Sequence, residues 1–225
     1  MGILVEKNQA VIVLGLGDFA DVVSFILNEK IGAKVVCYTV NKQYLERSEY
    51  HGVPVIPFEE INEYYPPTEY AMVIGFIGKK MFQQRALAFN QAKEMGYELP
   101  NVIHPSAAVD AKKIGQSNII FHNVSVEHHC EIGDGNIIWQ NVICPHHNKI
   151  GNFNNLAPAV SLSGYASIHS HCFIGNNVSI KNKVHIHDFA YIGAGTYVYR
   201  DVASRTVWVP PRSYPLPEKD PFDFL

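Results

Sequence analysis

Histidine is the residue type in this sequence that most suggests chemistry. Ten of the eleven histidines lie between residues 103 and 187, and the remaining one is His51. A neutral imidazole can accept a proton near pH 7, and it is also a common metal ligand. The sequence therefore predicts either a general base or a metal site in the second half of the chain.

The spacing of these histidines is regular. The separation of His146 from His128 is the same as that of Gly164 from His146, and both separations are a multiple of six. His129 and His147 form a neighbouring pair with the same separation. If the chain completes one coil over this distance, Gly164 lies directly above His146, and His146 lies above His128.

A repeat of six residues predicts such a coil. In steps of six from Ile114 to Val198, every position is apolar, and the position four residues after each is small or short. Neither an amphipathic helix nor an alternating strand keeps this period. A fixed period of six is typical of a parallel β-helix, in which three hexads form one triangular coil. The apolar residue then points inward, and the residues two and three positions later point outward.

The first hundred residues show another pattern. Apolar runs at residues 10–14, 34–38, 52–56 and 70–75 predict strands. Helical spacing of the apolar side chains at residues 22–27, and a predicted helix over residues 79–95, lie between or after them. This alternation predicts a small parallel α/β sheet. The predicted division is residues 1–100 for this domain, 101–203 for the β-helix and 204–225 for a C-terminal tail.

A short glycine loop in the first domain is a candidate nucleotide site. Gly15, Gly17 and Ala20 follow a strand and precede a helix, where glycines let phosphate approach the backbone. The acid expected after the next strand of a dinucleotide site is replaced by Asn41. We therefore expect a mononucleotide group rather than a dinucleotide. A tight turn without any ligand is the structural alternative.

The candidate substrate-binding residues lie in loops after three of the predicted strands. Asn41 is expected near the base, and Gly78 and Lys79 near the diphosphate; a solvated helix terminus is the alternative for Lys79. The full predicted set is Gly15, Gly17, Asp18, Phe19, Asn41, Gly78 and Lys79.

Composition excludes several classes of protein. The net charge is -3, and 17% of residues are charged, without the basic stripe that a nucleic-acid partner requires. The sequence has no apolar run long enough to span a membrane and no apolar segment typical of a signal peptide. Four cysteines without C-x-x-C spacing are expected to be buried free thiols. We expect a cytoplasmic protein.

The segment from Cys144 to Gly164 resembles a known family. His146-x-x-x-Ile150-Gly151, with Ser161-Leu162-x-Gly164 one coil later, is similar to the catalytic coil of bacterial sugar acetyltransferases of the sialic acid O-acetyltransferase-like family. These proteins join a small Rossmann-like domain to a left-handed β-helix and are usually homotrimers. The resemblance covers nearly the whole chain in the same domain order.

The resemblance implies roles for three residues. His146 corresponds to the general base, and the main-chain N–H of Gly164 to the group that holds the thioester carbonyl. The residue after the base is usually an acid that orients the imidazole, but here it is His147. A second histidine can orient the first but does not stabilise an imidazolium as a carboxylate does. Glu127 and Glu131, in the coil below, are alternative acids.

The resemblance also implies a cofactor site and a partner. Acetyl-CoA, as co-substrate, would lie in the groove between two β-helices, and no metal is expected. The predicted CoA-binding residues are Gly164, Ala166, Gly175, Ile180, Lys181 and Arg200. The end of the chain, from Trp208 to Arg212, resembles the segment that closes these β-helices near the CoA adenine.

The sequence therefore predicts an acetyl-CoA-dependent N-acetyltransferase that acts on the amino group of a nucleotide-linked amino sugar. A sugar O-acetyltransferase on the same scaffold is the main alternative. A metal enzyme resembling γ-type carbonic anhydrase is disfavoured, because its ligands include two histidines five residues apart and no such pair occurs here. A binding module without catalysis is the last alternative.

Overall fold

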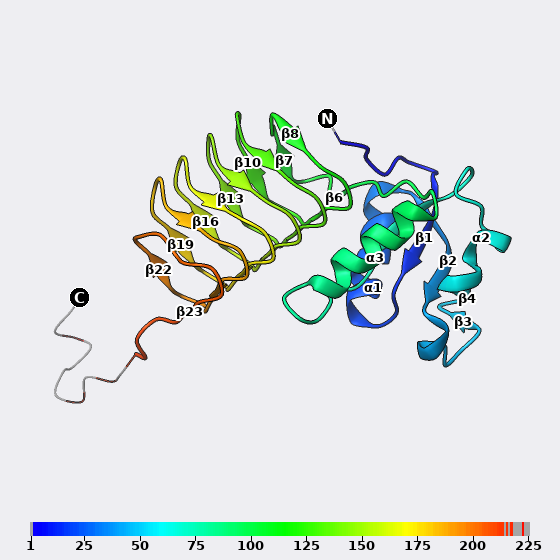
Figure 1. Ribbon diagram of the computed structural model, residues 1–225. Helices are drawn as coiled ribbons and strands as arrows, with labels where there is room; N and C mark the ends of the chain where they lie inside the picture. The colour runs from blue at the N-terminus through cyan, green and yellow to red at the C-terminus, as the bar shows by residue number, and fades with distance from the viewer. Residues whose placement is uncertain (1, 214, 216, 218–221, 223–225) are drawn as a thin grey trace.

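The computed structural model describes residues 2–213, 215, 217 and 222. Figure 1 shows an α/β domain that packs against one end of a β-helix, with strands β22 and β23 at the other end. The predicted position of the C-terminal tail falls partly outside the described residues. No helix among the described residues is long and apolar enough to cross a membrane.

The N-terminal domain is a five-stranded sheet with the order β3-β4-β2-β1-β5. The pairs β4–β2, β2–β1 and β1–β5 are parallel, as the sequence predicts, whereas β3 pairs antiparallel with β4 and was not predicted. The elements are β1 (Ala10–Leu14), α1 (Asp18–Phe25), a π-helical turn (Ile26–Ile31), β2 (Lys34–Val40), a 3-10 turn (Lys42–Tyr44), β3 (Glu49–Tyr50), β4 (Val53–Pro57), a second 3-10 turn (Phe58–Glu60), α2 (Ile61–Tyr64), β5 (Ala71–Ile74) and α3 (Gln83–Glu94).

The apolar side chains of β1 explain why helices cover both faces of this sheet. Val11 and Val13 belong to a buried cluster with α1, whereas Ile12 and Leu14 belong to a second cluster with α3. Alternate side chains of a strand point to opposite faces, so a strand that is apolar at every position requires cover on both. Helix α3 begins at Gln83, later than predicted, because the three residues before it have positive φ.

The β-helix consists of three flat walls of parallel two-residue strands. Wall 1 contains β6 (Val102–Ile103), β9 (Ile119–Ile120), β12 (Ile137–Ile138), β15 (Asn155–Leu156), β18 (Phe173–Ile174), β21 (Tyr191–Ile192) and β23 (Val207–Trp208). Wall 2 contains β7 (Ala108–Val109), β10 (Ser125–Val126), β13 (Ile143–Cys144), β16 (Ser161–Leu162), β19 (Ser179–Ile180) and β22 (Tyr197–Val198). Wall 3 contains β8 (Lys113–Ile114), β11 (Glu131–Ile132), β14 (Lys149–Ile150), β17 (Ser167–Ile168) and β20 (His185–Ile186).

The interior of the β-helix confirms the hexad pattern. Every predicted inward position from Ile114 to Val198 is at most 9% exposed, and Cys130, Cys144 and Cys172 are buried free thiols among the residues of the interior. The repeat extends beyond the predicted limits. Strand β23 pairs with β21 in a segment that the predicted division assigned to the tail. The residues just after 203 therefore continue wall 1.

A ladder of buried asparagines lines the corner between walls 3 and 1. The Asn118 Oδ1 atom accepts hydrogen bonds from both the main-chain N–H and the side-chain amide of Asn136, at 2.9 and 3.0 Å. The Asn136 Oδ1 atom likewise accepts from the main-chain N–H of Asn154, and the Asn136 amide also donates to the Gly151 carbonyl. The sequence identified these positions only as short side chains, whereas the structure shows that they satisfy buried main-chain groups at each turn.

The N-terminal domain packs against the outer face of wall 1. Phe19, at the start of α1, forms a T-shaped pair with Trp139, with ring centroids 5.7 Å apart, and Trp139 stacks on Phe121 with centroids 4.4 Å apart. Ile119 and Ile137, the outward residues of β9 and β12, are buried in the same cluster. The α/β domain therefore occupies the outer face of wall 1 in the first coils.

The asparagine ladder leads to a test of stability. Asn136→Ala removes the amide that donates to Asn118 and Gly151 and the oxygen that accepts from Asn154. Unsatisfied buried groups cost about 1–3 kcal/mol each, so we expect a clearly lower unfolding midpoint in thermal or urea denaturation. Asn176→Ala, at an exposed corner, is the matched control and should leave the midpoint nearly unchanged. Equal midpoints for the two variants would contradict a structural role for the ladder.

Candidate active site

His146 lies at the corner where the chain leaves wall 2 for wall 3, after strand β13. Its side chain is exposed, and Gly164 occupies the same corner one coil above. A Cβ atom on Gly164 would lie only 2.6 Å from the His146 Cε1 atom. Any residue larger than glycine would displace the imidazole, so the structure brings His146 and Gly164 into direct contact as predicted from their spacing.

The main-chain N–H of Gly164 is available to a ligand. It donates no main-chain hydrogen bond within the described part of the chain, whereas the Gly164 carbonyl accepts from the Lys183 N–H at 3.2 Å. A fixed main-chain N–H beside a base is the arrangement that stabilises an oxyanion in acyl transfer. The corner therefore combines a possible base with a possible oxyanion donor.

His147 contacts His146 through a ring nitrogen. The two Nδ1 atoms are 3.2 Å apart, which is a hydrogen-bond distance. The His147 ring stacks between those of His129 and Tyr165, with centroid separations of 4.6 and 4.7 Å. The column fixes the plane of His147 and, through it, the orientation of His146.

The proton of this pair decides whether His146 can act as a base. If the His146 Nδ1–H donates to the His147 Nδ1, the His146 Nε2 atom keeps its lone pair and can accept a proton. The opposite arrangement puts a hydrogen on the Nε2 atom. Because the partner of one ring nitrogen sets the protonation of the other, His147 must be the acceptor for His146 to act as a base.

The two glutamates suggested as alternative acids lie in other positions. The Glu127 Oε2 atom accepts a hydrogen bond from the main-chain N–H of His146 at 3.2 Å, not from its ring. Glu131 lines a groove on wall 3 together with His147 and Lys149. Among the described residues, the imidazole of His146 has His147 as its hydrogen-bonding partner, and neither glutamate bonds to it.

The predicted CoA-binding residues do not all lie together. Lys181 and Arg200 are exposed at the same edge of wall 2, above Gly164, and the Arg200 guanidinium lies 5.5 Å from the Tyr199 ring centroid. The side chains of Ala166 and Ile180 are buried in the core, so only their main-chain atoms could contact a cofactor.

Gly175 is separated from this group. It follows strand β18 of wall 1, and a Cβ atom there would lie 2.5 Å from the Ala194 nitrogen. Gly175 therefore stands at the corner after wall 1, below Gly193, whereas Gly164 stands at the corner after wall 2. The structure does not bring these two glycines together, because their separation in the sequence is less than one whole coil and therefore places them at different corners.

The glycine loop of the N-terminal domain has the geometry that requires glycine. Gly15 and Gly17 have φ values of 129° and 91°, and a Cβ on Gly15 would lie 2.9 Å from the Gly75 carbonyl oxygen. Helix α1 begins at the next residue, Asp18, whose side chain is exposed. Phe19, by contrast, packs on Trp139, so its ring serves the domain contact.

The other predicted substrate residues lie along the same edge of the sheet. Asn41 follows β2, and its amide donates to the Glu59 Oε1 atom at 3.4 Å. Gly78, with a φ of 91°, and Lys79 follow β5. The carboxyl ends of parallel strands meet at one edge, where ligands bind open α/β sheets. The structure thus brings these loops together at one edge of the N-terminal sheet. Because this domain packs on wall 1, the loops do not lie at the corner that carries His146.

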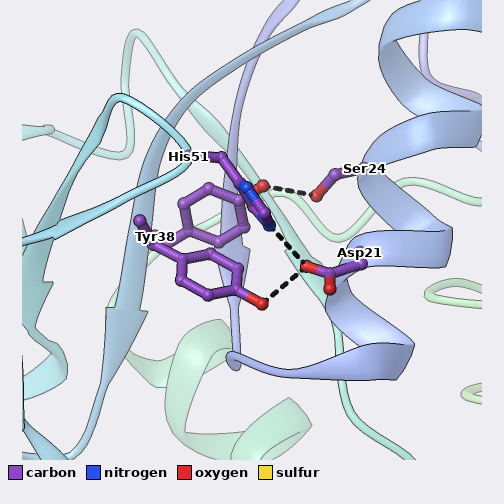
Figure 2. Close-up of polar contacts among 5 residues, drawn as sticks. Asp21, Ser24, Tyr38 and His51 are labelled. Carbon is purple, nitrogen blue, oxygen red and sulfur yellow. Dashed lines mark hydrogen bonds and ion pairs between the residues drawn. The ribbon is translucent and has the colours of Figure 1, made fainter.

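A polar cluster beside the glycine loop has no counterpart in the sequence prediction (Figure 2). The Asp21 Oδ1 atom accepts hydrogen bonds from the Tyr50 hydroxyl at 2.7 Å and from the His51 Nε2 atom at 3.0 Å. The Tyr38 hydroxyl donates to the Ser24 Oγ atom at 2.8 Å. The bond to Asp21 raises the pKa of the Tyr50 hydroxyl. These contacts connect the β3–β4 hairpin to α1, and no motif in the sequence could have indicated them.

Metal ligation has no structural support within the described part of the chain. No three histidine, cysteine, aspartate or glutamate side chains among these residues come close enough to hold a metal ion. The histidine columns bring rings together instead. The His129 ring stacks on that of His147, and the His169 ring lies tilted against that of His187.

Comparisons with known proteins agree with this fold. The family model of the bacterial transferase hexapeptide (six repeats) matches residues 165–200. The acetyltransferase domain of PglB from Neisseria gonorrhoeae FA1090 is 22% identical, with a TM-score of 0.79 over 93% of this chain and 100% of that chain. No curated protein matches the sequence.

Two further similar structures come from Caulobacter crescentus. PerB, solved in complex with CoA and GDP-perosamine, is 23% identical, with a TM-score of 0.79 over 90% of this chain and 94% of its own. A variant of perosamine N-acetyltransferase gives a TM-score of 0.81 at the same identity and coverage. These similarities confirm the predicted fold class, a Rossmann-like α/β domain followed by a left-handed β-helix.

The contact between His146 and His147 gives a spectroscopic prediction. In protein with 15N-labelled histidine, long-range nitrogen–proton NMR should show His146 with its hydrogen on Nδ1. His147→Phe keeps the ring stack but removes the acceptor, so the hydrogen should move to Nε2. His147→Asn retains an acceptor and should preserve the native tautomer. An unchanged His146 tautomer in His147→Phe would show that His147 does not control it.

Proposed function

We propose that this protein is an acetyl-CoA-dependent N-acetyltransferase that acts on the amino group of a nucleotide-linked amino sugar, with His146 as the general base. The observation that carries the proposal is the contact of His146 with Gly164, which places an exposed imidazole beside a main-chain N–H without a main-chain partner among the described residues. Two structures of similar fold are described as an acetyltransferase domain and as a variant of perosamine N-acetyltransferase, the second with bound CoA and GDP-perosamine.

The chemistry is a direct transfer at this corner. The His146 Nε2 atom removes a proton from the acceptor amine as its nitrogen attacks the thioester carbonyl carbon. The new carbon–nitrogen bond forms, and the Gly164 N–H donates to the oxyanion. The carbon–sulfur bond then breaks, and the His146 imidazolium returns the proton to the thiolate of CoA. The buried cysteines take no part in this reaction.

An amine acceptor suits this base. A sugar amine is largely protonated at neutral pH and attacks only after it has lost that proton, so a neutral imidazole beside the amine can serve as the general base. Lys181 and Arg200 at the same edge of wall 2 provide positive charge for the phosphates of CoA.

The nucleotide would bind to the N-terminal domain. The glycine loop offers main-chain N–H groups at the start of α1, and the loop after β5 adds Gly78 and Lys79. Asp18 and Asp21 lie in the same first turn, but the Asp21 carboxylate already accepts from Tyr50 and His51. These donors partly compensate a charge that would otherwise repel a diphosphate.

Two copies of the chain are needed to complete such a site. The N-terminal domain packs on wall 1, whereas His146 lies at the corner between walls 2 and 3. A nucleotide sugar on the domain of one copy would therefore reach the His146 corner of a neighbouring copy. In a homotrimer around a threefold axis, every copy has a neighbour on each side, so each His146 corner can face the N-terminal domain of a neighbouring copy.

The proposed general base can be tested by mutation. Thiol release from acetyl-CoA is measured against a panel of dTDP-, UDP- and GDP-linked amino sugars. One member should be turned over by the wild type, and His146→Ala should lower kcat by about 10²–10⁴-fold. His128→Ala, at the same corner one coil below, is the matched control and should retain most activity.

The outcomes separate the alternatives. Turnover of a hydroxyl sugar and of no amino sugar would move the substrate class to O-acetylation on the same scaffold. Undiminished turnover in His146→Ala would refute the assignment of the base. No turnover and no acetyl-CoA binding by the wild type would leave only a binding module.

The supporting role of His147 can be tested in the same assay. Its Nδ1 atom and an aspartate Oδ atom lie at the same number of bonds from the main chain, and aspartate tolerates the left-handed φ of 64° at this position. His147→Asp should therefore match or exceed the wild-type kcat, because a carboxylate stabilises the imidazolium. His147→Phe should lower kcat by about tenfold or more. Equal kcat values for the two variants would show that residue 147 does not support the base.

A further inference from the structure

The loop after β5 has an unusual main-chain conformation. Lys80, Met81 and Phe82 have φ values of 52°, 52° and 64°, so three successive non-glycine residues are left-handed. This conformation costs about 1–2 kcal/mol per residue. A segment of this kind persists only where its surroundings hold it, and such segments concentrate at functional sites.

Arg85, in the first turns of α3, holds one end of this loop. Its Nη1 atom donates to the carbonyls of Ile74 and Phe76, at 2.9 and 2.7 Å, where β5 passes into the loop. Its Nε and Nη2 atoms donate to the carbonyls of Gly135 and Ser117 in the β-helix, at 2.9 and 3.1 Å. One side chain therefore joins the loop to the first two coils.

The charge of Arg85 is buried without a counter-ion. The side chain is 1% exposed, and the ion pairs within the described residues are Lys42–Glu60 and Asp21–His51. Burial lowers the pKa of Arg85 to about 9, so the guanidinium is still protonated at neutral pH. A buried guanidinium without a carboxylate is costly to retain, and an apolar side chain would fill the space without that cost.

His171 holds the other end of the loop. Its Nδ1 atom lies 3.1 Å from the Met81 carbonyl oxygen, so it must carry a hydrogen and donate. The ring is fixed between Phe153 and Phe189, with centroid separations of 5.5 and 4.9 Å. The corner between walls 3 and 1 thus supplies a rigid donor to the middle of the left-handed segment.

The held loop lies against the glycine loop. Gly75, at its start, donates its N–H to the Leu14 carbonyl at 2.8 Å, and the Gly75 carbonyl is the nearest atom to a Cβ built on Gly15. Strands β1 and β5 are neighbours from which the chain continues on opposite faces of the sheet, and ligands of open α/β sheets bind at such a point.

We propose that Arg85 and His171 are positioning residues that hold residues 76–82 as the second wall of a nucleoside-diphosphate site opposite the glycine loop. The inference rests on the proposed function, because it takes the nucleotide to bind at this edge of the sheet. The β-helix therefore supports nucleotide binding indirectly, by holding a loop that belongs to the N-terminal domain. Arg85 and His171 themselves do not contact the ligand.

The test uses two variants that keep most of the packing. Arg85→Lys retains the positive charge but cannot reach four carbonyls, and His171→Phe retains the stack but removes the donor to Met81. The matched control is His169→Phe, since the His169 ring lies tilted against that of His187 in a neighbouring column and makes no bond to the loop. The readouts are calorimetric affinity for UDP, GDP and dTDP, and KM for the nucleotide sugar and for acetyl-CoA.

Both variants should bind the preferred nucleotide about tenfold more weakly, which corresponds to about 1.4 kcal/mol. KM for the nucleotide sugar should rise in parallel, while KM for acetyl-CoA stays within about twofold. His169→Phe should match the wild type. A merely structural role would lower the unfolding midpoint without this split between the two substrates.

The outcomes distinguish this inference from the function on which it rests. If the wild type binds none of the three nucleotides and turns over no nucleotide sugar, the proposed function fails. If the wild type binds one and His171→Phe binds it equally well, the inference fails and the function stands. If Arg85→Lys does not fold, His171→Phe decides alone.

Discussion

The stacking of each coil on the one below, three hexads earlier in the chain, is the constraint on which the rest of the structure depends. Because of this stacking, residues separated by one whole coil lie directly above one another. The corner between walls 2 and 3 therefore carries His128, His146 and Gly164 in successive coils. The stacking also makes Gly164 obligatory, because the imidazole below fills the space that a side chain would need. The candidate active site follows from this geometry without any flexible loop.

The same constraint explains how the α/β domain is fixed. Main-chain carbonyls and aromatic rings recur once per coil at the corner between walls 3 and 1, and side chains of the α/β domain contact several of them. Arg85 bonds to the carbonyls of Gly135 and Ser117, and the rings of Phe89 and Phe153 meet in a T-shaped arrangement with centroids 5.5 Å apart. Each coil of a solenoid contacts its neighbours in the same way, so these carbonyls and rings recur at equal steps along the corner. The domain therefore has one fixed position relative to wall 1.

Most of the fold could be predicted from the sequence, because period and phase are local properties. The inward position of Cys144 and the vertical contact of His146 with Gly164 followed from the spacing alone. The asparagine ladder was missed because the pattern identifies Asn136 only as short, and its hydrogen bonds depend on neighbours a whole coil away. Gly175 was grouped with Gly164 as a CoA-binding residue, although their separation of less than one coil already places them at different corners.

Contacts between the two domains could not be predicted, since they join segments without any shared period. Nothing in the sequence around Arg85 indicates that it bonds to Ser117, 32 residues later. The partner of the His146 ring is a similar case. The sequence places His147 next to His146, but only the stack of His129 and Tyr165 around His147 explains how its ring is fixed.

The measurement that tests the central claim most directly is a crystal structure with CoA and a nucleotide-linked amino sugar bound together. The account predicts the CoA sulfur at the corner between His146 and Gly164, and the acceptor nitrogen within hydrogen-bond distance of the His146 Nε2 atom. The nucleotide should lie on the glycine loop of a neighbouring copy. CoA on another face of the β-helix, or an acceptor nitrogen beside a different base, would contradict the account.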